Sequence, residues 1–459
     1  MKTATRFSFV SLAFAALLHS SLLADEQADK IQALEKRVEQ LEKLLQQRDA
    51  KAAAAPPGDA PKPAETPQSL PSLSIGASGF TLRSADTNFM LRFRGLLQLD
   101  SHWSDDDAIG DSFLVRRARP ILEGTVFRDF DFLLTPELAG SSPSLRDAWV
   151  NYRYNEVLQL RIGKMKPPGN LERWQSAANL LFIERSPVSL LWPVRDVGVM
   201  LHGELWPGDK DTTKTLAASG LANYSVGLFN GTGDGRSAGN SDFDSDKTVA
   251  GRLFFHPLLK SRIELVRKLG VGVSGTYGEM SGDSGLPEDF GYAADVTADG
   301  PHWRVGPQAY WYWGPFGVIG EYAVSSQRLE LQVAPFGSTR AENSAWAITA
   351  SWLLTGEEGT FGYPTPKRTF DPANGGWGAF QLVARYSGLD IDDGLFPTFA
   401  DPAELATSAT VWGVGLNWFL NRNIRASFNY THTDLKGGQS GSVADLGENA
   451  FLTRVQLAF

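Results

Sequence analysis

The sequence predicts an all-β fold: a 16-stranded antiparallel transmembrane β-barrel, preceded by a short N-terminal coiled-coil helix and a Pro-rich linker. Three observations predict it. Between residues 88 and 459, roughly sixteen segments of about ten residues alternate polar and apolar side chains with a period of two. The connections between these segments alternate between very short turns and long loops. The chain also begins with the pattern of an export signal, and its 459 residues include no cysteine.

Residues 1–24 have the layout of a cleaved secretory signal peptide. Lys2 and Arg6 precede an apolar stretch at 7–18, and Ala24 precedes a charged run. The alternative is a buried N-terminal helix. No later segment reaches the ~18 consecutive apolar residues of a transmembrane helix. We therefore expect export to the bacterial outer membrane and contact with its lipid.

Residues 25–50 are predicted to form a coiled-coil oligomerisation helix. Apolar side chains recur there at spacings of three and four residues, which is an a/d heptad seam; its members are Ile31, Leu34, Val38, Leu41 and Leu45. The seam is short, so we expect a small clamp on subunits held together elsewhere. The alternative is an amphipathic helix packed on its own domain. Residues 51–87 follow as an Ala/Pro-rich linker with six prolines in 51–72.

The barrel is predicted over residues 88–459, from the order of its connections. Very short links stand at 128–129, 155, 314–315 and 421–423, and each follows an even-numbered strand. Long links rich in Gly, Asp and Ser stand at 104–112, 165–194, 231–246, 281–301, 389–408 and 435–448. Short turns at one end and long loops at the other are typical of outer-membrane barrels. The long links 208–219 and 355–376 are exceptions to this regularity.

The two faces of the strands differ in chemistry. Leu91 and Phe93 share one face of the first strand, and Arg92 and Arg94 share the other. A membrane-spanning sheet satisfies its backbone only if it closes, and its apolar face then meets lipid. Aromatic residues also gather at strand ends, as interfacial girdles require. The alternative is a large soluble β-sandwich or barrel with a polar outside.

The polar face is basic although the chain carries a formal net charge of −9. Alternation places eleven arginines in the lumen: Arg92, Arg94, Arg117, Arg119, Arg153, Arg161, Arg252, Arg304, Arg385, Arg425 and Arg454. Asp100, Glu123 and Glu321 are the clear acidic residues on that face, and most other carboxylates lie in loops. The overall charge argues against nucleic acid as a partner. Guanidinium groups stay charged and bind oxyanions with two parallel hydrogen bonds, so this face predicts a path for anions.

The connection 165–194 is predicted to fold into the barrel. It contains Arg173, Arg185 and an apolar stretch at 180–183 that calls for burial. A loop folded inward would bury this stretch and narrow the pore, with Lys164 and Lys166 at the constriction. The alternative is that the loop packs against a neighbouring subunit.

Several segments resemble the phosphate-selective porin O and P family. They are RRARPILEGTVFRDFDFLL (116–134), DAWVNYRY (147–154), LQLRIGKMKPPGNLERWQSAANLLFIERS (158–186), WAITASWLLTGE (346–357), WGAFQLVARYSGLDID (377–392) and the terminal LTRVQLAF. The resemblance implies a sixteen-stranded barrel, a homotrimer and anion uptake. It also implies an arginine-lined path, an inward-folded third loop and a lysine cluster near the narrowest point. Lys164 and Lys166 would form that cluster, and Arg117 and Arg119 would line the wall.

We therefore expect a porin for passive diffusion of small anions, with inorganic phosphate or polyphosphate-like oxyanions favoured. A sugar-selective or general porin is one alternative, since Tyr310 and Tyr312 could face inward as a slide for sugars. A structural or adhesive barrel using loops 281–301 and 389–408 is another. The five histidines after residue 24 are scattered without metal-binding spacing. We accordingly expect no catalytic site, no metal and no cofactor.

Overall fold

A computed structural model divides the chain into two compact units, residues 1–68 and 69–459. It describes residues 70–105, 111–207, 220–240, 245–282, 286, 290, 292–334, 336–401, 405–437 and 447–459, together with six positions between 36 and 43. Those six positions are helical, and Lys43 and Glu39 form an ion pair of 3.5 Å there. The predicted signal peptide 1–24, the five seam residues of the coiled coil and linker residues 51–69 lie outside the described residues.

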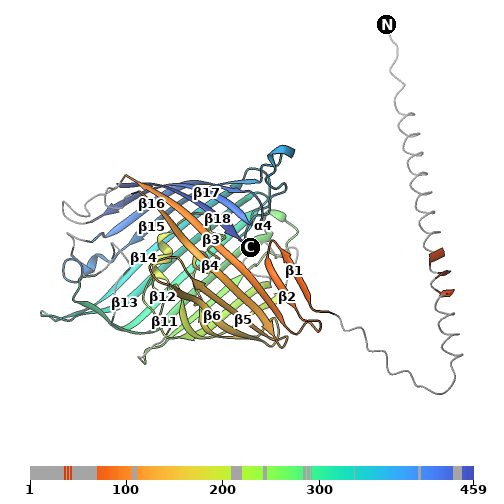
Figure 1. Cartoon of the computed structure of the whole chain (residues 1–459). Coiled ribbons are helices and arrows are strands. Elements are labelled where there is room, and N and C mark those ends of the chain that lie inside the picture. The colour runs from red at the N-terminus through yellow and green to blue at the C-terminus, as the bar shows by residue number, and fades with distance from the viewer. Residues whose placement is uncertain are drawn as a thin grey trace, which may run out of the picture. The chain divides into compact units, whose positions relative to one another are not determined.

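The second unit is a β-barrel of sixteen strands in the described part of the chain (Figure 1). Its strands are β3 (Met90–Ser104), β4 (Ser112–Val126), β5 (Phe130–Glu137), β6 (Ser144–Arg153), β7 (Gln159–Met165), β8 (Asp196–Pro207), β9 (Gly220–Phe229), β10 (Thr248–Phe255), β11 (Lys268–Gly282), β12 (Val296–Trp313), β13 (Phe316–Leu331), β14 (Ser338–Leu353), β15 (Ala379–Asp390), β16 (Ser408–Phe419), β17 (Ile424–Lys436) and β18 (Gly447–Ala458). The predicted sixteen-stranded fold is confirmed.

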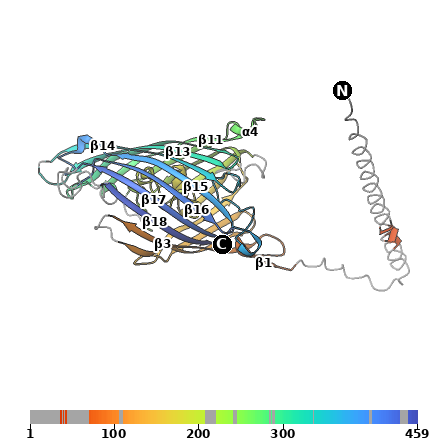
Figure 2. The same cartoon turned by 90° about the horizontal axis from the view of Figure 1, so that it is seen from above.

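The barrel closes by pairing its first and last strands. Each strand pairs antiparallel with its neighbours in sequence, and β18 pairs with β3, where Arg454 lies opposite Asp100. Phe459 then exchanges backbone hydrogen bonds of 2.9 and 3.0 Å with Gly95. Figure 2 shows β18 and β3 side by side. Closure leaves the sixteen barrel strands without a free edge, which is the condition for strands to cross a bilayer.

A short hairpin precedes the barrel and corrects the predicted extent of the linker. Strands β1 (Ser72–Gly76) and β2 (Gly79–Arg83) pair with each other, and β2 also pairs with the start of β3. Phe80 of β2 packs against Phe459, with ring centroids 6.2 Å apart. Residues 72–83 therefore belong to the folded unit rather than to the linker predicted over 51–87. The alternation of polar and apolar residues in 72–83 is short and directly follows a proline-rich stretch, so the segment was predicted as part of the linker.

The apolar face of the strands points outward, as predicted. In β3, Leu91 and Phe93 are 43% and 41% exposed, whereas Gln98 and Asp100 are 0% and 4% exposed. The same contrast recurs around the barrel. Exposed aliphatic and aromatic side chains in every strand suit a lipid boundary and contradict a soluble barrel.

The connections carry short helices and one unexpected inward segment. The helical turns are α2 (Leu171–Trp174), η1 (Pro187–Leu191), α4 (Glu264–Arg267), η3 (Pro372–Asn374) and η4 (Asp393–Leu395). Among the described residues, no helix is long and apolar enough to cross a membrane. The long link after β14, predicted at 355–376, enters the barrel, where Phe361 is 7% exposed and accepts a 2.5 Å hydrogen bond from Gln175. This explains one exception to the turn pattern, and the other, 208–219, lies outside the described residues.

One side of the barrel interior is filled by apolar side chains. Val188, Leu191 and Trp192 of the loop between β7 and β8 are fully buried against the inner faces of β13, β14 and β15. Phe399, from the loop after β15, belongs to the same cluster. This core leaves the opposite side, along β3 to β8, as the open part of the interior.

Candidate functional site

The loop between β7 and β8, residues 166–195, lies inside the barrel and is held there by wall side chains. Backbone carbonyls of 177–184 accept hydrogen bonds from a row of polar residues on β3, β15, β16, β17 and β18. The pairs are Gln98 with Ala177 (3.2 Å), Gln456 with Ala178 (3.1 Å), Arg425 with Leu180 (2.9 Å), Asn417 with Leu181 (2.9 Å), Arg454 with Ile183 (3.0 Å) and Arg385 with Glu184 (2.9 Å). The inward fold of this loop agrees with the prediction, and its carbonyls explain why the wall is polar there.

An outer cavity of about 510 Å³ opens between this loop and the wall, on the side of the long loops. Eight basic side chains and one carboxylate line it: Arg116, Arg117, Arg119, Arg146, Lys166, Arg173, Arg185, Arg195 and Glu137. Gly235 and Ser237, from the loop after β9, complete its rim. The cavity therefore concentrates positive charge at one level of the barrel.

An inner cavity of about 320 Å³ follows on the side of the short turns. Its charged residues are Arg94, Arg119, Asp147, Arg161, Lys166 and Arg195. Apolar side chains make up much of the rest: Leu96, Ile121, Leu133, Trp149, Met165 and Trp174. Arg119, Lys166, Ala177 and Arg195 line both cavities, so these four residues form the boundary between them.

Two β-bulges bring extra arginines into the outer cavity. In β4 the register passes from Arg117 to Val115 and leaves Arg116 without a partner in β3. In β6 it passes from Asp147 to Leu145 and leaves Arg146 without a partner in β5. A bulge puts two successive side chains on nearly the same face. Strict alternation assigned neither residue to the lumen. The sequence did carry one sign of each bulge, since alternation placed a charged arginine on the face that should meet lipid.

The basic residues of the site divide into paired and unpaired groups. Arg119 lies 2.6 Å from Glu137, Arg195 lies 2.8 Å from Asp147, and Arg116 lies 3.2 Å from Glu184. Arg117 hydrogen-bonds only Gln98 among the described residues, at 2.6 Å. Arg146 and Arg161 make neither an ion pair nor a hydrogen bond with any residue that the structure describes. The Nε atom of each is buried and has no partner. Such unpaired guanidiniums are available to an anion.

Lys166 lies at the boundary of the two cavities. Its Nζ donates to the carbonyls of Trp174 and Gln175 at 3.0 and 2.8 Å. Burial, followed by the nearby charges of Arg195 and Arg185, lowers the pKa of Lys166 well below its usual value. An anion beside it would favour its protonated form.

A match to a family profile assigns the chain to a protein family. The profile described as phosphate-selective porin O and P matches residues 97–459, which is most of the chain. The chain belongs to this family. It is an outer-membrane porin, and the family and fold are those of channel proteins. The resemblance noted in the sequence is thereby confirmed.

Solved porins share the barrel at low sequence identity. The anion-selective porin from Comamonas acidovorans aligns with a TM-score of 0.52 and 12% identity, over 81% of this chain and 100% of its own. The trimer form of OmpT from Vibrio cholerae gives 0.52 and 12%, over 81% and 99%. The outer membrane channel DcaP of Acinetobacter baumannii gives 0.50 and 11%, over 83% and 100%. These likenesses show the fold alone, and no curated protein sequence matches the chain.

Five of the predicted lumen arginines of the porin serve to hold loops or neighbouring strands. Arg385, Arg425 and Arg454 bind the carbonyls of the loop 166–195, and Arg454 also makes two bonds of 2.7 and 2.6 Å to Asp100. Arg304 binds Asp234 at 2.5 Å and so anchors the loop after β9. The fifth is Arg252, which binds Asn223 and Gln308 and lies 5.4 Å over the ring of Trp174. All five face inward, and each donates at least one hydrogen bond, although Arg252 Nη2, Arg385 Nε and Arg425 Nε have no partner among the described residues.

The remaining predicted residues lie at different levels of the porin. Arg92 and Arg94 share Glu123, at 3.2 and 2.7 Å, near the short turns. Arg153 pairs with Asp131 at 3.1 Å near the same end. Arg117, Arg119 and Lys166 line the outer cavity, and Arg94, Arg119, Arg161 and Lys166 line the inner one.

Lys164 lines neither cavity. Its Nζ donates to Ala238 O, Gly239 O and Asn240 Oδ1 at 2.8, 3.3 and 2.9 Å, so it holds the loop after β9. The preceding Gly163 has φ +129, a region that favours glycine, and a Cβ there would lie 2.2 Å from the Ala148 carbonyl oxygen. This placement differs from the predicted constriction role, because Lys166 alone of the pair lines the two cavities.

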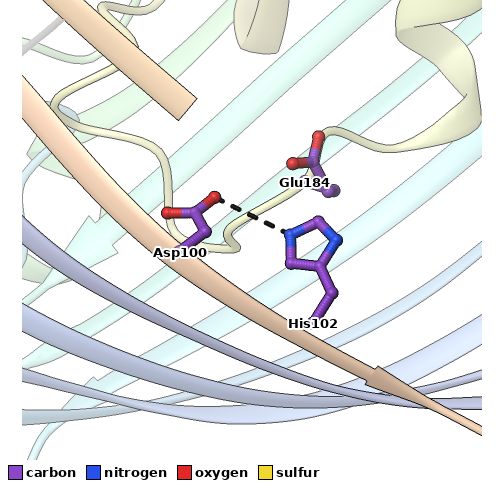
Figure 3. A group of neighbouring side chains, drawn as sticks. All are labelled: Asp100, His102 and Glu184. Carbon is purple, nitrogen blue, oxygen red and sulfur yellow. Dashed lines mark ion pairs between the residues drawn. The ribbon is translucent and has the colours of Figure 1, made fainter. Parts of the chain in front are cut away.

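Asp100, His102 and Glu184 form a cluster that could be considered for a metal ion (Figure 3). His102 Nε2 lies 3.8 Å from Asp100 Oδ2. Both carboxylates, however, already bind guanidiniums: Arg454 on Asp100 and Arg116 on Glu184. Burial raises the pKa of Glu184, but Arg116 and Arg454 more than offset this and hold it below its usual value. Two arginines beside the cluster would repel a cation, so these residues do not fit a metal site.

Tyr310 and Tyr312 face inward but are covered. They are 1% and 2% exposed, and Phe361 stacks on Tyr310 with ring centroids 5.5 Å apart. Leu171 of the inward loop packs on the same cluster. These two tyrosines therefore offer no open aromatic track to a sugar.

Proposed function

We propose that this porin allows passive diffusion of small anions across the outer membrane, through the outer and inner cavities in series. The observation that carries the proposal is the lining of the outer cavity, where eight basic side chains face one carboxylate. A cleft with one sign of charge and walls of low dielectric focuses the field and raises the local concentration of counter-ions. Every anion that crosses would pass this level of the barrel.

Oxyanions such as inorganic phosphate suit this lining better than chloride does. Neither Arg117 nor Arg146 makes an ion pair or a hydrogen bond with a described carboxylate. A guanidinium presents a planar fork that matches two oxygens of a phosphate or carboxylate. A unit-charge pair near 4 Å is worth about 4 kcal/mol at an effective dielectric constant of 20. Several such groups in series attract an anion and still release it, because each site is only moderately deep.

We further infer a homotrimer that reaches the outer membrane through a cleaved signal at 1–24, with the helix at 25–50 as an added clamp. The trimer form of OmpT from Vibrio cholerae, which shares the barrel fold, supports this assembly. Exposed apolar side chains on every strand provide the lipid boundary. Chemical cross-linking of the full chain in membranes should give a three-subunit product.

Planar-bilayer recording under a salt gradient tests the proposed transport. We expect a reversal potential on the anion side, and a cation preference would end the proposal. Phosphate, sulfate and pyrophosphate should each reduce the chloride current, and their relative strength measures which oxyanion the pore favours. A sugar-selective porin would instead show current block by neutral oligosaccharides, and the covered Tyr310 and Tyr312 speak against that result.

A further inference from the structure

The inner cavity differs from the outer one in kind. Four successive strands each contribute one inward apolar residue to it, and the inward loop adds an indole ring; the five residues are Leu96, Ile121, Leu133, Trp149 and Trp174. Leu133 and Trp149 lie directly opposite each other across β5 and β6. The described lining of the outer cavity contains no aromatic side chain. An apolar wall is unnecessary for conducting a small inorganic ion.

Arg161 gives the inner cavity a free cation beside this wall. Its Cζ lies 4.1 Å from the centroid of the Trp149 ring. It makes neither a hydrogen bond nor an ion pair with a described residue, and its Nε is buried. A guanidinium stacked on an indole keeps its edge free to bind an oxyanion while its face stays on the ring.

A purely structural role explains this arrangement incompletely. Stacking on Trp149 stabilises the wall, but a buried guanidinium nitrogen such as Arg161 Nε is costly without a hydrogen-bond acceptor. Gly163 lies opposite Trp149 across β6 and β7 and has no side chain to cover the indole. The remaining volume of about 320 Å³ falls within the range of small-molecule sites, which is about 300–1,000 Å³.

We propose that the inner cavity is a second subsite of the pore, which takes organic anions with an aromatic or branched aliphatic body. The carboxylate or phosphate group of such a ligand binds Arg161, and its apolar body packs against Leu133 and Trp149. The outer cavity selects ligands by charge, and the inner cavity adds affinity for the apolar body of an organic anion. This inference rests on the proposed function, because the ligand must first enter an anion-conducting pore.

Block of the chloride current by benzoate and by acetate tests the proposal. Both probes are monovalent carboxylates, so their difference reports the apolar body alone. With the full-length porin in planar bilayers, benzoate should half-block the current at about one tenth of the acetate concentration, because it buries a ring that acetate lacks. Equal half-blocking concentrations in an anion-selective channel would overturn this inference and leave the proposed function intact. A cation-selective channel would overturn both.

Variants place the subsite. Trp149→Ala should bring the ratio of the acetate to the benzoate concentration from about ten to about one. Leu133→Asn, a smaller change on the paired strand, should lower the ratio in the same direction and decides the matter if Trp149→Ala does not assemble. Trp412→Ala removes an indole that is 41% exposed on the outer face of β16 and serves as the matched control, with the ratio unchanged. A ratio that stays near ten in both lumen variants would show that the apolar contact lies elsewhere and would overturn the assignment.

Discussion

The two sides of this barrel use arginine for opposite purposes. On the side of β15 to β18, Arg385, Arg425 and Arg454 are buried and bind the backbone carbonyls of the inward loop. On the side of β3 to β7, Arg146 and Arg161 face the cavities without an ion pair to any described residue. The residue type and the inward orientation are the same. The neighbours decide the role, since donors that already bind loop carbonyls are not offered to a passing anion.

Loss of an anchoring arginine should have the largest effect. Arg454→Met would leave Asp100, which is 4% exposed, as a buried carboxylate without its guanidinium. Breaking a buried pair in this way costs about 3–5 kcal/mol. We expect the free energy of unfolding, measured in urea with the porin in lipid vesicles, to fall by that amount.

The matched control for this change is Arg153→Met. Arg153 also pairs with an aspartate, Asp131, but its side chain is 40% exposed near the short turns. Exposed pairs contribute about 0–1 kcal/mol. The double variant Asp100→Leu/Arg454→Met should recover part of the loss. Equal unfolding curves for Arg454→Met and the wild type would contradict the anchoring role.

Removal of an unpaired arginine should change selectivity rather than stability. Arg146→Gln takes a free cation from the outer cavity, whereas Lys164→Gln takes a cation that holds residues 238–240. Hydrogen bonds to charged groups contribute about 1.5–3 kcal/mol, so the phosphate concentration that half-blocks the chloride current should rise roughly tenfold or more in Arg146→Gln. Lys164→Gln should change it less than about twofold. A larger increase in Lys164→Gln than in Arg146→Gln would show that Lys164, as first predicted, lies at the constriction.

The one carboxylate of the outer cavity should limit its anion preference. Glu137 accepts from Arg119 Nε at 2.6 Å and from the Ala118 amide at 2.8 Å. In Glu137→Gln the side-chain oxygen can still accept the amide hydrogen, but the charge that offsets Arg119 is gone. We expect the anion-to-cation permeability ratio, taken from the reversal potential, to rise by about threefold at low salt and less at high salt. A lower ratio would show that Glu137 positions Arg119 rather than offsets it.

The sequence predicted the barrel well because alternation and turn length are local patterns that lipid and closure enforce. The inward loop followed from buried apolar residues at 180–183. Local patterns did not reveal which inward arginines have partners, because Arg454 and Ile183 meet across 271 residues of sequence. Strict alternation also missed Arg146, because a bulge is a register shift that only pairing with β5 defines. The positive φ of Gly163 was also not predicted by any pattern of residues.

The smallest expected effect is a loss of anion preference as the pH rises past the lowered pKa of Lys166. Burial lowers the pKa of Lys166 well below its usual value, so this lysine loses its charge at a lower pH than the ~10.4 of a solvated lysine. Below its own pKa it is charged, and above it one of the eight basic groups of the outer cavity is neutral. The permeability ratio should therefore decline modestly as the pH rises through this lowered pKa. Arginine keeps its charge there, so Lys166→Arg should hold the ratio constant over the same range. A decline of equal size in both proteins would assign the titration to another group, and a constant ratio in the wild type would show that the pore keeps Lys166 protonated.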